Sequence, residues 1–401
     1  APETEPEAEP PPPSEVPPAP EPATEEAAEE TEAPAGAEDE KEERFDWLEN
    51  FGIRMFVDSY YMKDWLFPSG DQNITGTVGH RAFAHTNGFA VSFVALDVDY
   101  QSEKFGATVN LRWGPSTPRL IIGAPDSVSL ALENLKQGYL SWRPVEGLQL
   151  DLGQFDTIYG AEVSESFDNI NYTRGALYFL MQPFYHTGLR ASYAFNDKVS
   201  LTGLVVNATN DHIDSNPYPD VGLQLGFTPN DTFALALGYL VNLTENELTG
   251  DLDHQHFVDL VATADIGNLS LVFNADVGAT VLDQETAMAG GDTKLWWGAS
   301  LAAGYAVTSW FDVGLRGEFL QDVEDQFYGF ADGMNLVTGT LTLGFKPIPG
   351  RDNLLIRLDN RVEWASESIF PENGTVDDPT TITETNDVWA STVLGVVVKT
   401  D

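Results

Sequence analysis

The sequence has 401 residues, no cysteine and a formal net charge of −43. The lack of cysteine excludes disulfides, thiol nucleophiles and thiolate metal sites. No stretch of 18 apolar residues is present to form a transmembrane helix. Nucleic-acid binding needs a basic surface, so this charge also predicts no nucleic-acid partner.

Residues 1–46 differ in composition from the rest of the chain. They hold 17 acidic residues against Lys41 and Arg44, together with 11 of the 24 prolines. Apart from Val16, no large apolar residue precedes Phe45. Such a segment cannot bury enough apolar surface to offset the entropy lost on ordering. We therefore predict that residues 1–46 form a disordered, acidic tail rich in Pro and Glu.

From Phe51 onward, segments of alternating hydrophobicity follow one another, separated by turn residues. Strict alternation is typical of strands with one apolar and one polar face. One short helix is expected near residues 127–135. The pattern predicts about 16 strands, at residues 51–57, 96–100, 105–113, 138–143, 148–155, 188–195, 199–207, 221–227, 233–241, 257–266, 269–280, 295–307, 311–321, 337–345, 354–364 and 388–398.

The connections between these strands alternate between short and long. Residues 196–198 and 267–268 are examples of short turns, whereas residues 114–137 and 156–187 are long and polar. This alternation is typical of antiparallel hairpins in a membrane β-barrel, where short turns face the periplasm and long loops face outward. An even strand number puts both ends of the barrel on the short-turn side.

The charged face of each strand shows which side meets water. In residues 354–364, Arg357 and Arg361 share a face with Asp359 and Glu363, opposite an apolar face. An arginine facing lipid at mid-depth costs roughly 2–4 kcal/mol, and net domain stabilities are only ~5–15 kcal/mol. The charged face must therefore line a wet lumen.

A soluble β-sandwich or propeller would also show alternating strands. Three features favour a membrane barrel instead: strands of uniform length, alternating loop lengths and the absence of a blade-length repeat. A fourth feature is a set of aromatic residues near strand ends, as membrane-interface girdles require: Tyr100, Trp113, Trp142, Tyr239, Tyr305, Trp310, Phe345 and Trp364. The predicted fold class is thus all-β: residues 47–401 form a transmembrane, antiparallel, up-and-down β-barrel.

Two stretches resemble a known family. Residues 171–175 read NYTRG, and residues 182–190 read QPFYHTGLR, ahead of Val205-Val206-Asn207. These motifs resemble the OmpL-like β-barrel porin family of bacterial outer membranes, best over residues 138–207. Thr173 stands where that family has Ser, and Gln154 where it has Lys. The resemblance implies an outer-membrane location and a pore. With an even strand number, both termini are then expected in the periplasm, on the short-turn side.

The long connection at residues 156–187 is the first candidate site. A loop of this length between paired strands is uncommon and is usually functional. In general porins, which this architecture resembles, the third loop folds inward and sets the pore size. We expect the same here, with Glu162, Glu165, Asp168 and Arg174 near the constriction. The alternative is a loop that packs outside, over the mouth of the barrel.

Strand parity places a second set of residues on the lumen wall. By the same parity, Asp97, Asp99, Asp259, Asp265 and Asp276 also face the lumen. With them included, acidic residues outnumber basic ones on the wall, which favours a mild preference for cations. Part of this set is expected to be a solvated wall of cross-strand ion pairs. The pore-lining candidates are Arg54, Asp58, Arg112, Arg143, Asp151, Arg190, Asp312, Arg316, Glu318, Arg357, Asp359, Arg361 and Glu363.

Histidines supply no convincing catalytic or metal site. All six fall in predicted long loops or at their ends, so we expect no enzyme activity and no cofactor. His254 and His256, two residues apart, would share a strand face and are weak metal candidates, although an acidic surface loop explains them as well. His186 is expected to be a structural hydrogen-bonding residue.

The predicted function is an outer-membrane porin that passes small hydrophilic solutes or ions. The alternative is a structural or adhesive barrel, plugged by its loops, that acts through its tail or external loops; a barrel enzyme is a third reading. Expected partners are outer-membrane lipid and lipopolysaccharide, with a homotrimer by analogy with general porins. The tail is then either a periplasmic spacer or a tether to peptidoglycan or a periplasmic protein.

Overall fold

A computed structural model describes residues 49–65, 87–117, 132–214, 216–245, 252–281, 293–323, 333–371 and 384–400. The chain divides into two units, Ala1–Trp47 and Leu48–Asp401, and all described residues belong to the second. The predicted disordered tail lies outside the described residues. So does most of the predicted helix near residues 127–135, whose described end is a 3₁₀ turn, η2 (Leu132–Asn134).

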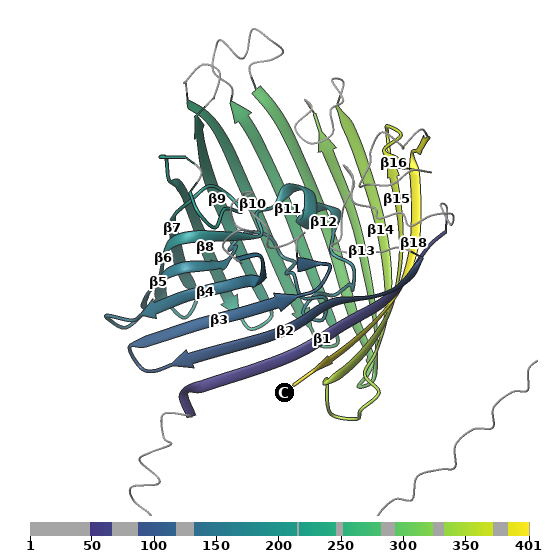
Figure 1. Cartoon of the computed structure of the whole chain (residues 1–401), viewed down its shortest axis with the longest axis horizontal. Coiled ribbons are helices and arrows are strands. Elements are labelled where there is room, and N and C mark those ends of the chain that lie inside the picture. Colours follow the sequence, from purple (N-terminus) through teal and green to yellow (C-terminus); the bar gives the residue numbers. More distant parts are fainter. Residues whose placement is uncertain are drawn as a thin grey trace, which may run out of the picture. The chain divides into compact units, whose positions relative to one another are not determined.

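Sixteen antiparallel strands form a closed barrel (Figure 1). Each strand pairs with its neighbours in sequence, and β1 closes the ring by pairing with β18. The first eight are β1 (Phe51–Asp64), β2 (Gly88–Gln101), β3 (Phe105–Trp113), β4 (Leu135–Trp142), β5 (Leu148–Asp156), β6 (Tyr185–Asn196), β7 (Val199–Val206) and β8 (Asp220–Asn230). The others are β9 (Phe233–Glu245), β10 (Leu252–Ile266), β11 (Leu269–Val281), β12 (Thr293–Thr308), β13 (Phe311–Asp322), β14 (Met334–Phe345), β15 (Leu354–Ala365) and β18 (Val388–Lys399).

The predicted fold class and the strand count are confirmed. The bounds differ at the outer ends, where several strands run further than their sequence pattern indicates: β10 begins at Leu252 rather than at residue 257. Ladder hydrogen bonds to an already formed neighbour continue past the point where the apolar alternation stops. The prediction missed one small feature, a two-stranded pair of β16 (Phe370–Pro371) and β17 (Thr385–Asn386) in the last long connection.

Tight turns join the strands at one end of the barrel. The β10–β11 turn has only Gly267 and Asn268, and Gly267 has φ +63. A glycine in this left-handed region at the first turn position suits a type II′ hairpin, whose twist matches that of the flanking strands. The start of β1 and the end of β18 lie at this same short-turn end.

The two faces of the wall have opposite character. Leu315 on the outside is 54% exposed, whereas Arg316, the next residue, is buried inside. Aromatic residues are exposed on the outer face near strand ends, Trp113, Trp142, Tyr305 and Trp310 among them. No helix in the described part of the chain is long and apolar enough to cross a membrane.

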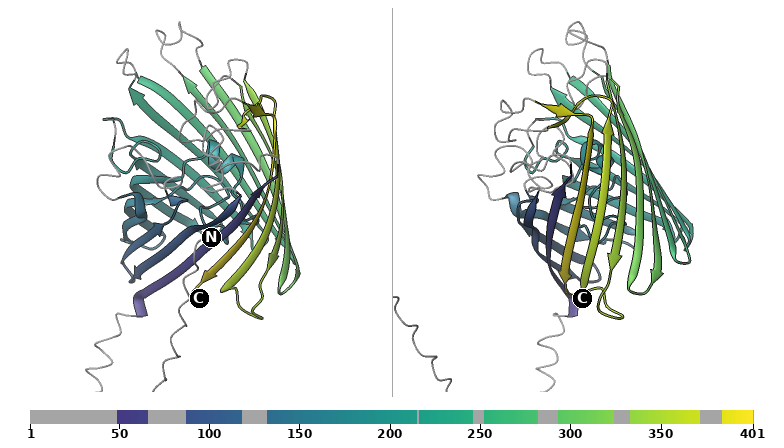
Figure 2. Two further views of the ribbon diagram at one scale, coloured as in Figure 1. Left: turned by 45° about the vertical axis from the view of Figure 1, so that its right-hand side comes forward. Right: turned by 90° about the vertical axis from the view of Figure 1, so that its right-hand side faces the viewer.

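The chain between β5 and β6, residues 157–184, lies inside the ring of strands (Figure 2). We call these residues the lumen loop. The loop contains a short helix, α4 (Ala176–Met181), which the strand-dominated prediction missed. Residues 176–181 (ALYFLM) are fair to good helix formers, and Pro183 ends the segment because proline cannot continue a helix. Four of its side chains join the buried apolar cluster of the lumen: Ala176, Leu177, Tyr178 and Met181.

Candidate functional site in the barrel lumen

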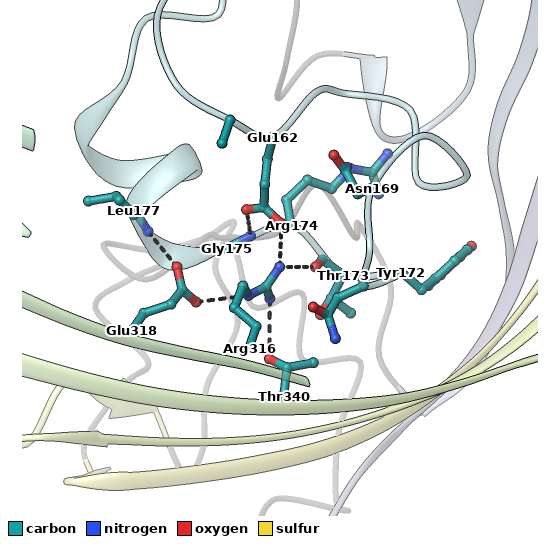
Figure 3. Close-up of polar contacts among 12 residues, drawn as sticks. Glu162, Asn169, Tyr172, Thr173, Arg174, Gly175, Leu177, Arg316, Glu318 and Thr340 are labelled. Carbon is teal, nitrogen blue, oxygen red and sulfur yellow. Dashed lines mark hydrogen bonds and ion pairs between the residues drawn. The ribbon is translucent and has the colours of Figure 1, made fainter. Parts of the chain in front are cut away.

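The NYTRG motif at residues 171–175 fastens the lumen loop to the far wall (Figure 3). Asn171 Nδ2 donates to Thr342 Oγ1 on β14 at 2.8 Å. The Tyr172 hydroxyl donates to Asp58 on β1 at 2.5 Å, and the Tyr172 and Thr173 backbone N–H groups donate to Asp359 on β15. Asn171, Tyr172 and Thr173 thus each bond to a wall strand other than β5 and β6, the strands that the loop connects.

Glycine on the wall makes this close approach feasible. A β-carbon at Gly395 of β18 would clash with the Tyr172 ring. On the other side of the lumen, a β-carbon at Gly238 of β9 would lie 2.5 Å from the Tyr159 ring. The Tyr159 hydroxyl donates to the Tyr239 carbonyl at 2.9 Å. The rings of these two loop tyrosines thus pack directly against glycine backbone on opposite walls of the barrel.

Arg316 on β13 is the centre of the polar network drawn in Figure 3. Its guanidinium pairs with Glu162 of the loop, donates to the Thr173 carbonyl at 2.8 Å and lies 3.3 Å from Glu318. Glu162 in turn accepts the Gly175 N–H at 2.6 Å. A planar guanidinium can hold several acceptors in fixed geometry. Arg316 therefore fixes two separate parts of the loop, one at Glu162 and one at Thr173.

Glu318 holds the start of α4. Its carboxylate accepts the backbone N–H groups of Ala176 and Leu177, each at 3.1 Å. These are first-turn donors that have no acceptor within the helix. The wall therefore caps a helix whose own N-cap residue, Gly175, has no side chain to do so.

Arginines on β15 bind loop carbonyls. Arg357 donates to the Ser166 and Asn169 carbonyls at 2.9 and 2.7 Å, and Arg361 donates to the Arg174 carbonyl at 2.5 Å. Buried carbonyls need such partners because water does not reach them. The contacts pair a charged wall with a loop backbone that has no regular secondary structure there.

Glu165 connects the loop to the β3–β4 wall. It lies 2.7 Å from both Arg112 and Lys136 and is only 3% exposed. Burial by itself would raise the pKa of this carboxyl, but Lys136 and Arg112 outweigh it and hold the pKa of Glu165 well below its usual range. Glu165 is therefore ionised at neutral pH, and this anchor is a charged one.

The second arm of the loop reaches β11. Gln182 Nε2 donates to Asn274 at 2.7 Å and to Asp276 at 2.6 Å. Ala161, at the other end of the loop, donates its N–H to the same Asn274 oxygen at 3.1 Å. The loop thus touches wall strands on every side of the lumen, from β1 and β3 to β11, β13 and β15.

The four constriction candidates are brought together in this loop but differ in environment. Glu162, Glu165 and Arg174 bond to other groups of the protein. Arg174, for example, donates to the Ser164 carbonyl at 2.9 Å. Asp168 is 49% exposed and lies 4.0 Å from Arg54. Asp168 is thus the candidate most accessible to a passing ion.

The pore-lining candidates lie on the inner wall, with Arg143 at the short-turn rim just beyond β4. Many contact one another or the loop: Arg112 lies 2.5 Å from Asp97, and Arg190 lies 2.9 Å from Asp151. Asp312 lies 3.8 Å from Lys346. Arg361 pairs with Glu363. These cross-strand pairs and loop contacts bury most of the set.

Sequence reasoning missed several partners: Lys136, Asn274 and Gln182, along with the hydroxyls of Tyr172 and Thr173. Lys136 is on the strand β4, which begins at Leu135 rather than at residue 138, so parity was not counted there. The family-like motif was the available signal for Gln182, Tyr172 and Thr173, whereas Asn274 lies outside the motif, in a predicted strand. The motif marked residues 171–175 and 182–190 without indicating what they contact.

Charge is unevenly distributed around the lumen. The sequence has no arginine between Arg190 and Arg316, so β7–β12 contribute none to the wall. Asp220, Asp259 and Asp276 lie buried on the inner face of that half. The wall arginines gather on β1, β3, β6, β13 and β15, and loop carboxylates pair with those of β1, β3 and β13.

The histidine positions require a correction. His186, His254 and His256 lie within strands β6 and β10, not in loops, because both strands extend beyond their sequence pattern. His254 and His256 share a face, with ring centroids 6.3 Å apart, and the Tyr239 hydroxyl lies 2.8 Å from His256 Nδ1. Among the described residues, no three His, Cys, Asp or Glu side chains gather into a group that could hold a metal ion. His186 contacts the Thr157 hydroxyl at 3.1 Å, and His80 and His85 lie outside the described residues.

A closed, sixteen-stranded barrel with an apolar outer face, a charged lumen and an inward-folded loop is the architecture of an outer-membrane porin-type channel. The chain belongs to the family described as "Putative beta-barrel porin-2, OmpL-like", which matches residues 50–390. The predicted family is therefore confirmed. None of the curated proteins matches the chain.

Solved structures of porin-type barrels share the fold at low sequence identity. OmpT, an outer membrane protein of Vibrio cholerae, is 9% identical with a TM-score of 0.54, covering 87% of this chain and 97% of its own. An anion-selective porin from Comamonas acidovorans is 11% identical with a TM-score of 0.54, covering 87% and 99%. Salmonella typhi OmpF, in complex with daunomycin, is 13% identical with a TM-score of 0.53, covering 87% and 97%. At such identities the likeness concerns the fold alone.

Proposed function

We propose that this outer-membrane barrel is a diffusion channel for small hydrophilic solutes or ions, with the lumen loop as its constriction. The observation that carries the proposal is the anchoring of residues 157–184 to inner-wall side chains all around the lumen. A loop held in this way reduces the free cross-section, and the groups that remain exposed beside it act on the solute.

Mild cation preference is part of the proposal. Carboxylates outnumber arginines and lysines around the loop, and Asp168 is exposed beside it. The β7–β12 half of the wall adds carboxylates and no arginine. A cation in the lumen is then attracted to surfaces where an anion is repelled.

The experiment is single-channel recording of the purified protein in a planar bilayer, with a salt gradient across it. Stepwise openings are expected, with a reversal potential on the cation side. A variant in which residues 159–182 are replaced by a short Gly-Ser linker should give a larger conductance, because β5 and β6 still pair with each other. Equal conductance in the two proteins would contradict the constriction.

The second candidate function, a plugged structural or adhesive barrel, is favoured by the same anchors. Glu165, Arg174 and Tyr172 are all 3% exposed or less, as in a protein core rather than a water-filled eyelet. A correctly folded protein that gives no openings, while the loop-shortened variant does, would favour this alternative.

Oligomeric state, topology and the tail are further proposals. We infer a homotrimer with both ends of the barrel in the periplasm and residues 1–46 as a disordered periplasmic segment. The solved structures of OmpT from Vibrio cholerae include a trimer form. Native electrophoresis tests the trimer, and protease added to intact cells tests the topology. Peptidoglycan and periplasmic pull-downs with and without residues 1–46 separate a tether from a spacer.

A further inference from the structure

Two carboxyl groups meet on the inner wall where β10 and β11 pair. Asp259 and Asp276 are cross-strand partners, both are 0% exposed, and their carboxyl groups contact each other. Asn274 Nδ2 donates to Asp259 at 2.7 Å and lies 3.3 Å from Asp276. The donors around the pair are thus neutral amides.

In the part of the chain that the structure describes, the elements packed against this pair bring no cation to it. Gly238 of β9 and Gly298 of β12 are the strand neighbours of Asp259 and Asp276. The loop contributes Gly160, Gln182 and Tyr159, which is the one titratable group among the described residues beside the pair. Burial and Asp259 raise the pKa of Tyr159, so it stays neutral. Two buried carboxylates in contact without a counter-charge cannot both ionise, and one proton is shared between them.

Both arms of the lumen loop are tied to this pair. The backbone of Gly160 lies beside Asp259, and Gln182 Nε2 donates to Asp276 at 2.6 Å. Ala161 and Gln182 also donate to Asn274, the residue that bridges the two carboxyl groups. The ends of the loop segment therefore depend on one cluster of side chains.

We propose that Asp259 and Asp276 form a proton-sharing latch, which holds the lumen loop against β10 and β11 and releases it as pH rises. When the shared proton leaves to solvent, two anions remain in contact. Their repulsion is relieved when the Gly160 and Gln182 arms withdraw and water reaches the carboxylates. Release of the loop stands by itself; its effect on conductance rests on the channel function proposed above.

Hydrogen–deuterium exchange of the full chain in detergent tests the latch directly. After correction for intrinsic exchange rates, peptides from residues 157–184 should lose protection as pH rises. In Asp276→Asn, the new amide can donate to Asp259 in place of the shared proton, so protection should become independent of pH. Asp99→Asn removes a lumen carboxylate that accepts from Thr108 and not from the loop, so loop protection in this variant should depend on pH as in the parent protein. Asp259→Asn provides the same test should Asp276→Asn fail to fold.

Conductance supplies the second reading. The parent channel should gain conductance or open-level noise with rising pH, and Asp276→Asn should lose this pH-dependent component. The latch would be overturned if residues 157–184 had the same exchange protection in the parent protein and in Asp276→Asn at every pH. A pH response that a chelator abolishes would also overturn it, since a bound divalent cation would then hold the pair. A protein that gives no openings but shows the exchange pattern keeps the latch and loses only the channel function.

Discussion

At the scale of single residues, the lumen loop is held by hydroxyls and backbone amides that meet charged wall side chains. Thr173 shows how specific this is. Its hydroxyl donates to Asp359 at 3.0 Å, and its backbone N–H donates to the same carboxylate. Serine, which the family-like motif has at this place, would supply the same hydroxyl.

The first prediction concerns that hydroxyl. Thr173→Val should leave Asp359 short of a donor and lower the free energy of loop opening by about 1–3 kcal/mol, the usual cost of a buried polar group without its partner. Thr173→Ser keeps the donor and is the matched control. Limited proteolysis within residues 157–184, scored on heat-modifiable folded protein, measures both; equal cleavage of the two variants would contradict the role of the hydroxyl.

The second prediction concerns pH at Glu165. Its pKa is lowered in the folded protein, so its stabilising contribution is present above the unfolded value of ~4.3 and is lost only as pH falls through the lower folded value. Loop protection by this anchor should therefore be constant from about pH 8 down to about pH 5.

Glu165→Gln should weaken loop protection throughout that range. It leaves Arg112 and Lys136 with one fewer counter-charge, at a cost on the order of 3 kcal/mol. Asp168→Asn makes the same charge change at an exposed position of the same loop and should have little effect on loop protection. A strong pH dependence between those limits in the parent protein that disappears in Glu165→Gln would contradict the depressed pKa.

At the level of the strands, each one has an apolar face toward the outside of the barrel and a polar face toward the lumen. In β13, Leu315 faces outward and Arg316 inward, and neighbouring strands keep the same parity. A shift of one residue in register would exchange the faces along the whole strand. Burial of the arginines therefore fixes the register as firmly as the apolar face does.

A third prediction follows from these faces. Leu315→Arg should destabilise the barrel by roughly 2–4 kcal/mol, because it puts a charge in lipid near mid-depth. Thr202→Arg, on the lumen face of β7, should cost much less, since this position does not face lipid and its side chain is half-buried. Equilibrium unfolding by urea in lipid vesicles compares the two; similar losses would argue that the assigned outer face does not meet lipid.

At the scale of the whole molecule, the lumen is divided. The arginines lie on β1, β3, β6, β13 and β15, and the β7–β12 wall adds only carboxylates and Lys294 near its outer end. An ion in the barrel would meet this arrangement together with the loop, because several of these wall side chains contact the loop. Selectivity is then a property of the assembled barrel and not of a single strand.

The fourth prediction concerns that selectivity. Asp168→Asn should move the reversal potential in a salt gradient toward zero, because it removes an exposed carboxylate beside the loop. Asp352→Asn removes an equally exposed carboxylate from the β14–β15 turn, where it lies 2.8 Å from Lys399. The control should leave selectivity nearly unchanged. A larger shift for Asp352→Asn would place the selective region at the rim instead.

The amino-acid pattern alone predicts the barrel: sixteen alternating segments, an outer and an inner face, and short turns at one end. It could do so because side-chain alternation is a local signal, repeated in every strand, and the cost of charge in lipid fixes which face is which. The strand ends were less certain, as β10 and His254 show, because ladder bonding continues where the apolar pattern stops. The NYTRG motif and the long connection also marked the lumen loop in advance.

The contacts of the loop, by contrast, become visible only in the folded barrel. The contacts of Tyr172 with Asp58 and of Gln182 with Asp276 join residues about a hundred positions apart. Periodicity carries no information about such pairs, since they exist only after β1 has met β18 and the ring has closed. For the same reason the buried pair of Asp259 and Asp276 read, in sequence, as two more solvated wall charges.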